Sequence, residues 1–206
     1  ALCETYNVLF IADEVQTGIA RTGRLLATCG NCSCEKRDCS GTPDVKPDIL
    51  ILGKALSGGA YPVSAVLAND PIMKVITPGS HGSTFGGNPI AAAVAMAALE
   101  VVVDEKLAEN AYNLGIIFRA ELNKFIKTST ICNEVRGEGL LNAILINDDE
   151  QSDTAWNICM RLRDNGLLAK PTHGNIIRFA PPLVMTQEQL HECISIITTT
   201  LKEFEV

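Results

Sequence analysis

The sequence predicts an α/β fold, with a mostly parallel sheet in its first part and a smaller α/β unit in its second part. Continuous aliphatic runs near residues 8–12, 48–52 and 62–67 indicate the first sheet. Such runs are typical of strands that are covered on both faces. The smaller unit is predicted from shorter strand and helix patterns that alternate in the second part of the chain.

Two long helical patterns follow the aliphatic runs. Asn88-Pro89 supplies a capping side chain and a proline at the first helical position, and an alanine-rich segment continues from it. Because small side chains permit close packing, we expect this helix to be buried. A second helix with one apolar face is predicted over about 105–126. We therefore place the C-terminal part of a large domain at 1–104, and a linking helix with a small C-terminal domain at 105–206.

The second part of the chain predicts strands near 131–136, 140–146 and 175–180, and a helix near 152–165. The final helix is expected to begin at the capping-box pattern Thr186-Gln-Glu-Gln189, in which a threonine hydroxyl and a glutamine side chain pair with each other's backbone N–H. Arg136 and Glu138 stand in a glycine-flanked segment, and we interpret both as turn residues.

Composition excludes several classes of protein. Apolar residues make up 47% and charged residues 20% of the chain, as in a globular protein with a sizeable core. The net charge of −7 argues against a nucleic-acid partner or an anionic membrane. No apolar run reaches the roughly 20 residues that a membrane span needs. The chain begins at Ala1 and enters a strand pattern at once, so we expect it to be a piece of a longer protein.

The sequence contains eight cysteines, and four of them (Cys29, Cys32, Cys34 and Cys39) crowd into a loop at 29–43. Three states are open for these four: a zinc site, a disulfide pair or free surface thiols. The spacing fits the usual zinc knuckle poorly, so no metal is assigned. The other four lie among apolar residues and are expected to be buried thiols in a reducing compartment: Cys3, Cys132, Cys159 and Cys193.

Lys54 and Asp13 are the residues that indicate chemistry. Each follows an aliphatic strand: Lys54 stands between glycines in 48–59, and Asp13 ends the run of 8–13. An amine and a carboxylate at the carboxyl ends of two strands suit pyridoxal phosphate (PLP), whose aldehyde needs a lysine and whose protonated ring nitrogen needs an acid. Taken alone, Lys54 fits a solvated loop lysine and Asp13 a turn or capping aspartate.

The motifs at Phe10–Gly23, Gly53–Gly59 and His81–Pro89 resemble the class III PLP-dependent aminotransferases. Within this class, 61–67 and 161–173 favour the ornithine aminotransferases over those that act on acetylornithine or 4-aminobutyrate. The likeness covers nearly the whole chain outside 29–41. It implies PLP-dependent transferase fold type I and the C-terminal half of such an enzyme.

The resemblance also implies a role for each motif residue. Lys54 would hold PLP as a Schiff base and then move a proton between substrate and cofactor carbons, while Asp13 would pair with the pyridine nitrogen. Val15 matches the residue that packs on the ring, and Gln16 the one that bonds its phenolic oxygen. Glu14 is predicted to be structural.

Ser83 and Thr84 lie in a glycine-rich turn before a helix, where hydroxyls and backbone N–H groups suit a phosphate. The alternative is an ordinary tight turn. In the family, the residue that matches Thr84 reaches the phosphate of the neighbouring subunit's cofactor, which implies a homodimer with shared active sites. Arg178 lies inside an apolar strand and needs a carboxylate partner. The resemblance implies the α-carboxylate of the substrate or 2-oxoglutarate; an internal glutamate is the alternative.

The resemblance implies transfer of the δ-amino group of L-ornithine to 2-oxoglutarate, giving glutamate semialdehyde and glutamate. Two alternatives stay open. One is a related ω-aminotransferase for acetylornithine, 4-aminobutyrate or a diamine. The other is an inactive fragment or a binding module built on the cysteine loop. The expected compartment is the mitochondrial matrix or the cytoplasm.

Overall fold

The computed structural model describes residues 2–29 and 45–205, so Cys32, Cys34 and Cys39 lie outside the described part. The chain divides into two compact units, Ala1–Glu109 and Asn110–Val206. The predicted boundary after residue 104 stands close to this division. Among the described residues, no helix is both long and apolar enough to cross a membrane.

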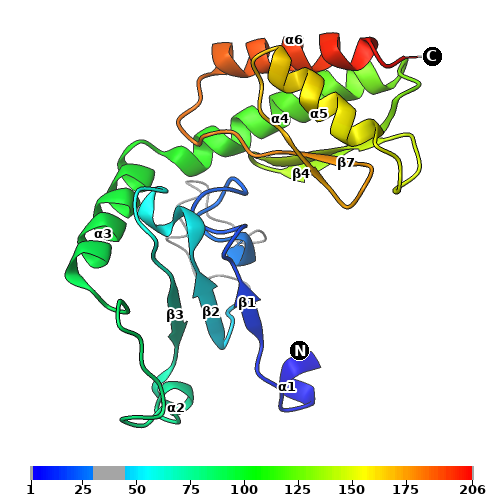
Figure 1. The fold of residues 1–206 in the computed structure, drawn as a ribbon. Coiled ribbons are helices and arrows are strands. Elements are labelled where there is room, and N and C mark those ends of the chain that lie inside the picture. Colours follow the sequence, from blue (N-terminus) through cyan, green and yellow to red (C-terminus); the bar gives the residue numbers. More distant parts are fainter. Residues whose placement is uncertain (1, 30–44, 206) are drawn as a thin grey trace. The chain divides into compact units, whose positions relative to one another are not determined.

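The first unit contains a small sheet with strand order β1-β2-β3 (Figure 1). β1 and β2 are parallel, and β3 pairs with β2 in the antiparallel direction. The aliphatic runs thus predicted all three strands, with shifted ends. The elements are α1 (Leu2–Thr5), β1 (Ile11–Asp13), the 3₁₀ helix η1 (Ala27–Cys29), β2 (Ile49–Leu52), the 3₁₀ helix η2 (Lys54–Ser57), β3 (Ala65–Ala68), α2 (Asp70–Met73) and α3 (Pro89–Asp104).

Helix α3 begins as predicted, because the Asn88 side chain accepts a hydrogen bond from the backbone N–H of Ala91 and Pro89 follows the cap. The expectation that α3 is buried is wrong for this chain. Only Ala91 and Val102 are buried along it. η2 packs on α3, where a Cβ at Gly58 would lie 3.5 Å from the Cβ of Ala98. Small side chains permit close packing, but burial needs a partner on each face.

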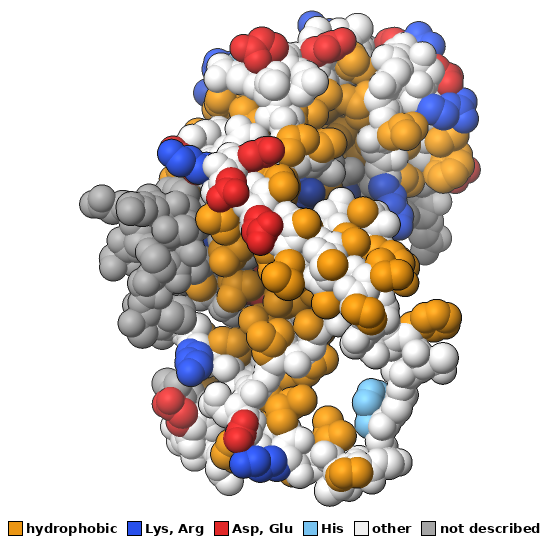
Figure 2. Space-filling view, turned by 90° about the vertical axis from the view of Figure 1, so that its left-hand side faces the viewer, with side chains coloured by type: hydrophobic (Ala, Val, Ile, Leu, Met, Phe, Trp, Pro, Cys, Tyr) orange, Lys and Arg blue, Asp and Glu red, His pale blue; other side chains and the backbone are white. Residues whose placement is uncertain are grey.

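Hydrophobic side chains are exposed over the part of the molecule that holds the first unit (Figure 2). Ile11 on β1 is 52% exposed and Val66 on β3 is 55% exposed, although both belong to the aliphatic runs. On α3, Ile90 and Met96 are exposed by 62% and 63%. Several exposed apolar side chains on one unit are typical of an interface.

The second unit is an antiparallel sheet of order β4-β5-β7-β6, with α4, α5 and α6 on one face (Figure 1). The helix faces and the inner side chains of β5 and β7 form one core, in which the rings of Phe118 and Phe179 lie 5.8 Å apart. The elements are α4 (Leu107–Ile126), β4 (Cys132–Glu138), β5 (Leu141–Ile146), α5 (Thr154–Asp164), β6 (Lys170–Thr172), β7 (Ile176–Phe179) and α6 (Gln187–Lys202).

The predicted capping box is confirmed, because Thr186 and Gln189 each accept a hydrogen bond from the other's backbone N–H at the start of α6. The turn predicted for Arg136 and Glu138 is wrong. Both residues belong to β4, and pairing with β5 continues as far as Glu138 opposite Leu141. The turn is therefore shorter than the glycines suggested.

Two of the scattered cysteines are buried in the second core, as predicted, and two are only half-buried. Burial, with a contribution from Glu205, raises the pKa of the Cys132 thiol to about 12. Burial also raises the pKa of Cys159 to about 11. Thiols that stay protonated at neutral pH are unreactive, so both act as small apolar side chains. The half-buried pair is Cys3 and Cys193.

A close backbone contact in the second unit joins α4 to the turn between β4 and β5. A Cβ at Gly115 would lie 2.0 Å from the carbonyl oxygen of Gly139. We expect Gly115→Ala to lower the free energy of unfolding by roughly 3 kcal/mol, since a backbone atom must move. Gly82→Ala is the control, because a Cβ there meets nothing within 4 Å. Denaturant unfolding measures both. A more stable Gly115→Ala variant, as helix propensity alone would give, would contradict this close packing.

Candidate active site

The carboxyl ends of β1 and β2 bring Asp13 and Lys54 to one edge of the first sheet. Asp13 pairs with Ile51 in the parallel register. The backbone N–H of Glu14 extends this pairing by donating to the carbonyl of Ile51 at 2.9 Å. β2 then ends, and Lys54 begins η2 directly after Gly53. Neighbouring parallel strands end at the same edge, so Asp13 and Lys54 stand at the edge where open α/β sheets bind their ligands.

The loops after these two strands touch each other. A Cβ at Gly53 would lie 3.4 Å from Cγ1 of Val15 and 3.7 Å from the Cβ of Ser64. Val15 is half-buried in this contact, whereas Asp13 and Gln16 are exposed. A carboxylate oxygen of Asp13 accepts a hydrogen bond from the backbone N–H of Val15 at 3.1 Å. The acid is therefore oriented by its own loop while its charge stays accessible.

Glu14 fixes the loop that carries these residues. Its side chain is only 2% exposed. Its carboxylate accepts hydrogen bonds from the hydroxyl of Thr17 at 2.6 Å and from the backbone N–H groups of Ala27 and Thr28 at 3.1 and 2.7 Å. These bonds tie the end of β1 to η1. The structural role predicted for Glu14 is confirmed. Further along the same loop, burial lowers the pKa of Arg21.

The backbone of Lys54 is left-handed, with φ of 46°. Such a conformation costs a side-chain-bearing residue roughly 1–2 kcal/mol, and it persists where the surroundings enforce it. Glycine is the residue that adopts this conformation without strain, but the residue at this position is a lysine. A strained lysine at the edge of a sheet is a feature that function explains better than packing, since the side chain is exposed.

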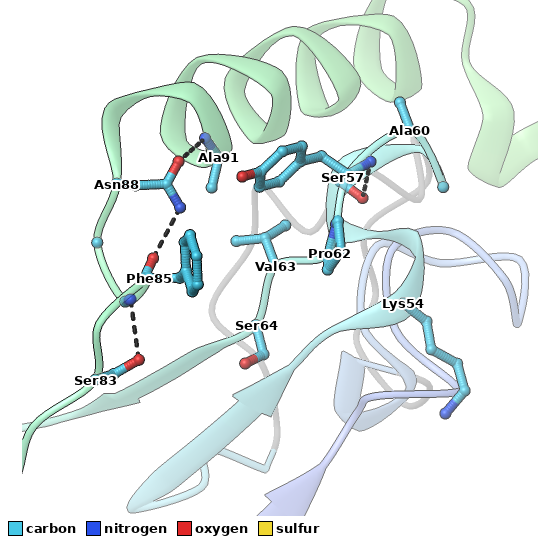
Figure 3. A pocket seen from close by; sticks show the side chains of 14 residues that line it. Lys54, Ser57, Ala60, Pro62, Val63, Ser64, Ser83, Phe85, Asn88 and Ala91 are labelled. Atoms are coloured by element: carbon cyan, nitrogen blue, oxygen red, sulfur yellow. Dashed lines mark hydrogen bonds between the residues drawn. The ribbon is translucent and has the colours of Figure 1, made fainter.

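Beside this edge lies a hollow of about 670 Å³ within the first unit (Figure 3). One wall is the turn before α3, where the Ser83 hydroxyl accepts a hydrogen bond from the backbone N–H of Gly86 at 3.0 Å. Lys54 belongs to the other wall, and its side chain points away from Ser83 and Asn88. The lining residues are Lys54, Ser57, Gly59, Ala60, Tyr61, Pro62, Val63, Ser64, Ser83, Phe85, Gly86, Gly87, Asn88 and Ala91.

The residues at this site fit PLP. The accessible amine and carboxylate stand at neighbouring strand ends, and the Gly53 contact with Val15 forms a close apolar wall beside them. The turn that contains Ser83 offers a hydroxyl, backbone N–H groups and the N-terminus of a 16-residue helix, all of which favour a phosphate. Thr84 is exposed in the same turn but does not line the hollow. Ser57 and Ser64 also line the hollow, although the sequence did not predict them as site residues. Their only signal was the small-residue composition of their segment.

Arg178 lies on β7 of the second unit and is half-buried. In the described part of the chain, no carboxylate forms an ion pair with it, so the partner that the sequence predicts is not an internal acid of these residues. His81, His173 and His191 are all exposed. Within residues 2–29 and 45–205, no three or more acidic, histidine or cysteine side chains lie together in a way that could hold a metal ion.

An α/β fold with an accessible lysine and an aspartate at adjacent parallel strand ends is the arrangement that PLP-dependent enzymes of fold type I use. Within them, the chain belongs to the family described as "Aminotransferase class-III", whose model matches residues 1–201. The predicted family and fold class are thereby confirmed.

Relatives of known name support the same family. The chain is 59% identical over 200 residues to the mitochondrial ornithine aminotransferase of Drosophila melanogaster, covering 97% of this chain and 42% of the relative. A crystal structure named acetylornithine aminotransferase, from Elizabethkingia anophelis, is 66% identical with a TM-score of 0.89, over 98% of this chain and 48% of that one. A structure of Plasmodium falciparum ornithine δ-aminotransferase is 50% identical with a TM-score of 0.88, over 98% and 48% of the two chains. The chain thus spans about half the length of the relatives it matches.

Proposed function

We propose that this chain carries the lysine-bearing part of an aminotransferase that moves the δ-amino group of L-ornithine to 2-oxoglutarate, giving glutamate semialdehyde and glutamate. The observation that supports it most is the position of Asp13 and Lys54 at the carboxyl ends of two adjacent parallel strands. Bound PLP supplies an electron sink for negative charge formed on the amino substrate. The identities of 50–60% to several ornithine aminotransferases support the donor.

Each site residue has a role in this proposal. Lys54 holds the cofactor through its amine and moves a proton at the substrate carbon. Asp13 keeps a proton on the ring nitrogen, and Val15 packs against the ring. Gln16 donates to the phenolic oxygen. Arg178 binds a carboxylate of the substrate through its planar guanidinium.

A homodimer with shared active sites is part of the proposal. Ser83 and Thr84 would hold the phosphate of the partner subunit's cofactor. Two observations favour this arrangement over use within one subunit: the side chain of Lys54 points away from Ser83 (Figure 3), and the first unit exposes a large apolar surface. The name of the Drosophila melanogaster relative, a mitochondrial ornithine aminotransferase, favours the mitochondrial matrix.

A second candidate is an acetylornithine aminotransferase. The specific observation in its favour is the 66% identity to the Elizabethkingia anophelis structure of that name. Both candidates use the same lysine and aspartate and the same type of acceptor. They differ only in the amine donor, so the distinction is one of specificity.

A panel of amine donors tests the function. The complete protein is supplied with 2-oxoglutarate and with L-ornithine, N-acetylornithine, 4-aminobutyrate or a diamine, and glutamate formation is measured. We expect kcat/KM for L-ornithine to exceed that of each competitor by at least about tenfold, which corresponds to 1.4 kcal/mol in the transition state. A higher value for N-acetylornithine selects the second candidate. Turnover of no donor contradicts both. Residues 1–206 alone are expected to bind PLP weakly and to show no transamination.

A further inference from the structure

A row of cations crosses the sheet of the second unit. Arg178 on β7 stands directly opposite Lys170 on β6, and on its other side opposite Ala143 on β5. Ala143 in turn stands opposite Arg136 on β4. Residues that are directly opposed in antiparallel strands project on the same face of the sheet. These four side chains therefore share one face, with the small Ala143 between the two arginines.

The row lies on the face away from the helices. The neighbours of Arg178 along β7, Ile177 and Phe179, are 0% and 6% exposed and belong to the core beneath α4, α5 and α6. Since side chains alternate along a strand, Arg178 projects to the opposite side. It is half-buried there, and Lys170 is exposed at the edge strand.

The charges along this row are balanced at one end only. Arg136 has Glu134 and Glu138 two positions away on its own strand, on the same face. The positions around Arg178 and Lys170 are different, because their same-face neighbours are Ile176, Ala143, Leu145 and Thr172. Neither cation forms an ion pair with any described acidic residue.

Two like charges directly opposite each other destabilise an antiparallel pair of strands. A half-buried guanidinium without a counter-charge adds a further cost. A bound anion removes both costs at once, because it neutralises the two cations and accepts their hydrogen bonds.

We propose that Lys170 and Arg178 together form one carboxylate site, in which Lys170 is the second cation that binds the acceptor 2-oxoglutarate. This inference rests on the proposed function, in which Arg178 binds a substrate carboxylate. The guanidinium fork engages both oxygens of a carboxylate, and the ammonium adds a point charge from the adjacent strand. Lys170 then sets the affinity for the acceptor and has no part in proton transfer.

Steady-state kinetics of the complete protein tests the role of Lys170. We expect Lys170→Gln to raise the KM for 2-oxoglutarate about five- to tenfold while kcat stays within twofold, the pattern of a lost binding contact. Lys202→Gln is the matched control, because Lys202 is an exposed lysine of the same unit at the end of α6. Equal KM values for Lys170→Gln, Lys202→Gln and the wild type would overturn the proposal.

Reversing the charge separates binding from stability. Lys170→Glu places a carboxylate directly opposite Arg178, so the cross-strand pair becomes attractive. We expect the melting temperature to stay equal or to rise, while the KM for 2-oxoglutarate increases more than in Lys170→Gln. A merely structural Lys170 predicts the same KM in both variants.

Calorimetry with glutarate provides a readout without turnover. In the Lys54→Ala background no transamination interferes, and the dissociation constant of this unreactive dicarboxylate is measured with and without Lys170→Gln. We expect a five- to tenfold weaker affinity when Lys170 is replaced. An unchanged constant, when the protein that keeps Lys54 transaminates, overturns this inference and leaves the proposed function intact. A weakened constant in a protein that turns over no donor supports the anion site and contradicts the proposed function.

Discussion

Replacing Lys54 by alanine is expected to lower kcat by about 10⁴-fold or more, because one amine both anchors the cofactor and moves the proton. The visible absorbance band of bound PLP should disappear from the purified variant. Reduction of the wild-type protein with borohydride, followed by peptide mapping, should place the cofactor label on residue 54. A label on any other lysine contradicts the assignment.

Two further variants separate loss of chemistry from loss of fold. Lys74→Ala is the control, since Lys74 is an exposed lysine of the same unit that pairs only with Asp70 at 3.0 Å on the surface. It should keep full activity. Lys54→Gly should be as inactive as Lys54→Ala but at least as stable as the wild type, because glycine adopts a φ of 46° without strain. A stable, inactive glycine variant would show that the strain at this position is maintained for catalysis.

The edge that carries Lys54 and Asp13 could be predicted from sequence because its signals are local. An aliphatic run that ends in a polar residue marks a strand end, and parallel strands end at a common edge. The left-handed backbone of Lys54 has no such signal. The contact of the neighbouring Gly53 with Val15 in the loop after β1 has none either, because it joins segments distant in the chain.

Burial and register escaped prediction for the same reason. The composition of α3 indicated a buried helix, but exposure depends on what covers each face. η2 packs on α3, and most of the helix stays exposed. Pro171 argued against a strand at 170–172, because proline is tolerated in a sheet only at its edge. β6 forms there nevertheless, since it is the edge strand. Without β6 there is no register that places Lys170 opposite Arg178. The pairing of these two cations is therefore a property of the fold and has no local sequence pattern.

Asp13 and Glu14 are adjacent carboxylates, and removing their charges should have opposite effects: the Asp13 variant should lose activity and the Glu14 variant should lose stability. Asp13→Asn keeps an oxygen that can accept from the backbone N–H of Val15, so the loop should hold its shape. The negative charge that retains a proton on the ring nitrogen is lost. We expect kcat to fall by roughly 10³-fold, the scale of one preorganised electrostatic contact, with the free energy of unfolding unchanged.

Glu14→Gln should show the reverse. The buried carboxylate accepts from Thr17, Ala27 and Thr28, and an amide has only one oxygen to offer these donors. Its NH₂ group would face an N–H or a hydroxyl, so the free energy of unfolding should fall by about 2–3 kcal/mol. At a temperature where the variant is folded, kcat should stay within about tenfold of the wild type. Denaturant unfolding and steady-state kinetics on both variants decide the matter, because equal losses of stability, or a larger kinetic loss in Glu14→Gln, would mean that the roles of the two acids are exchanged.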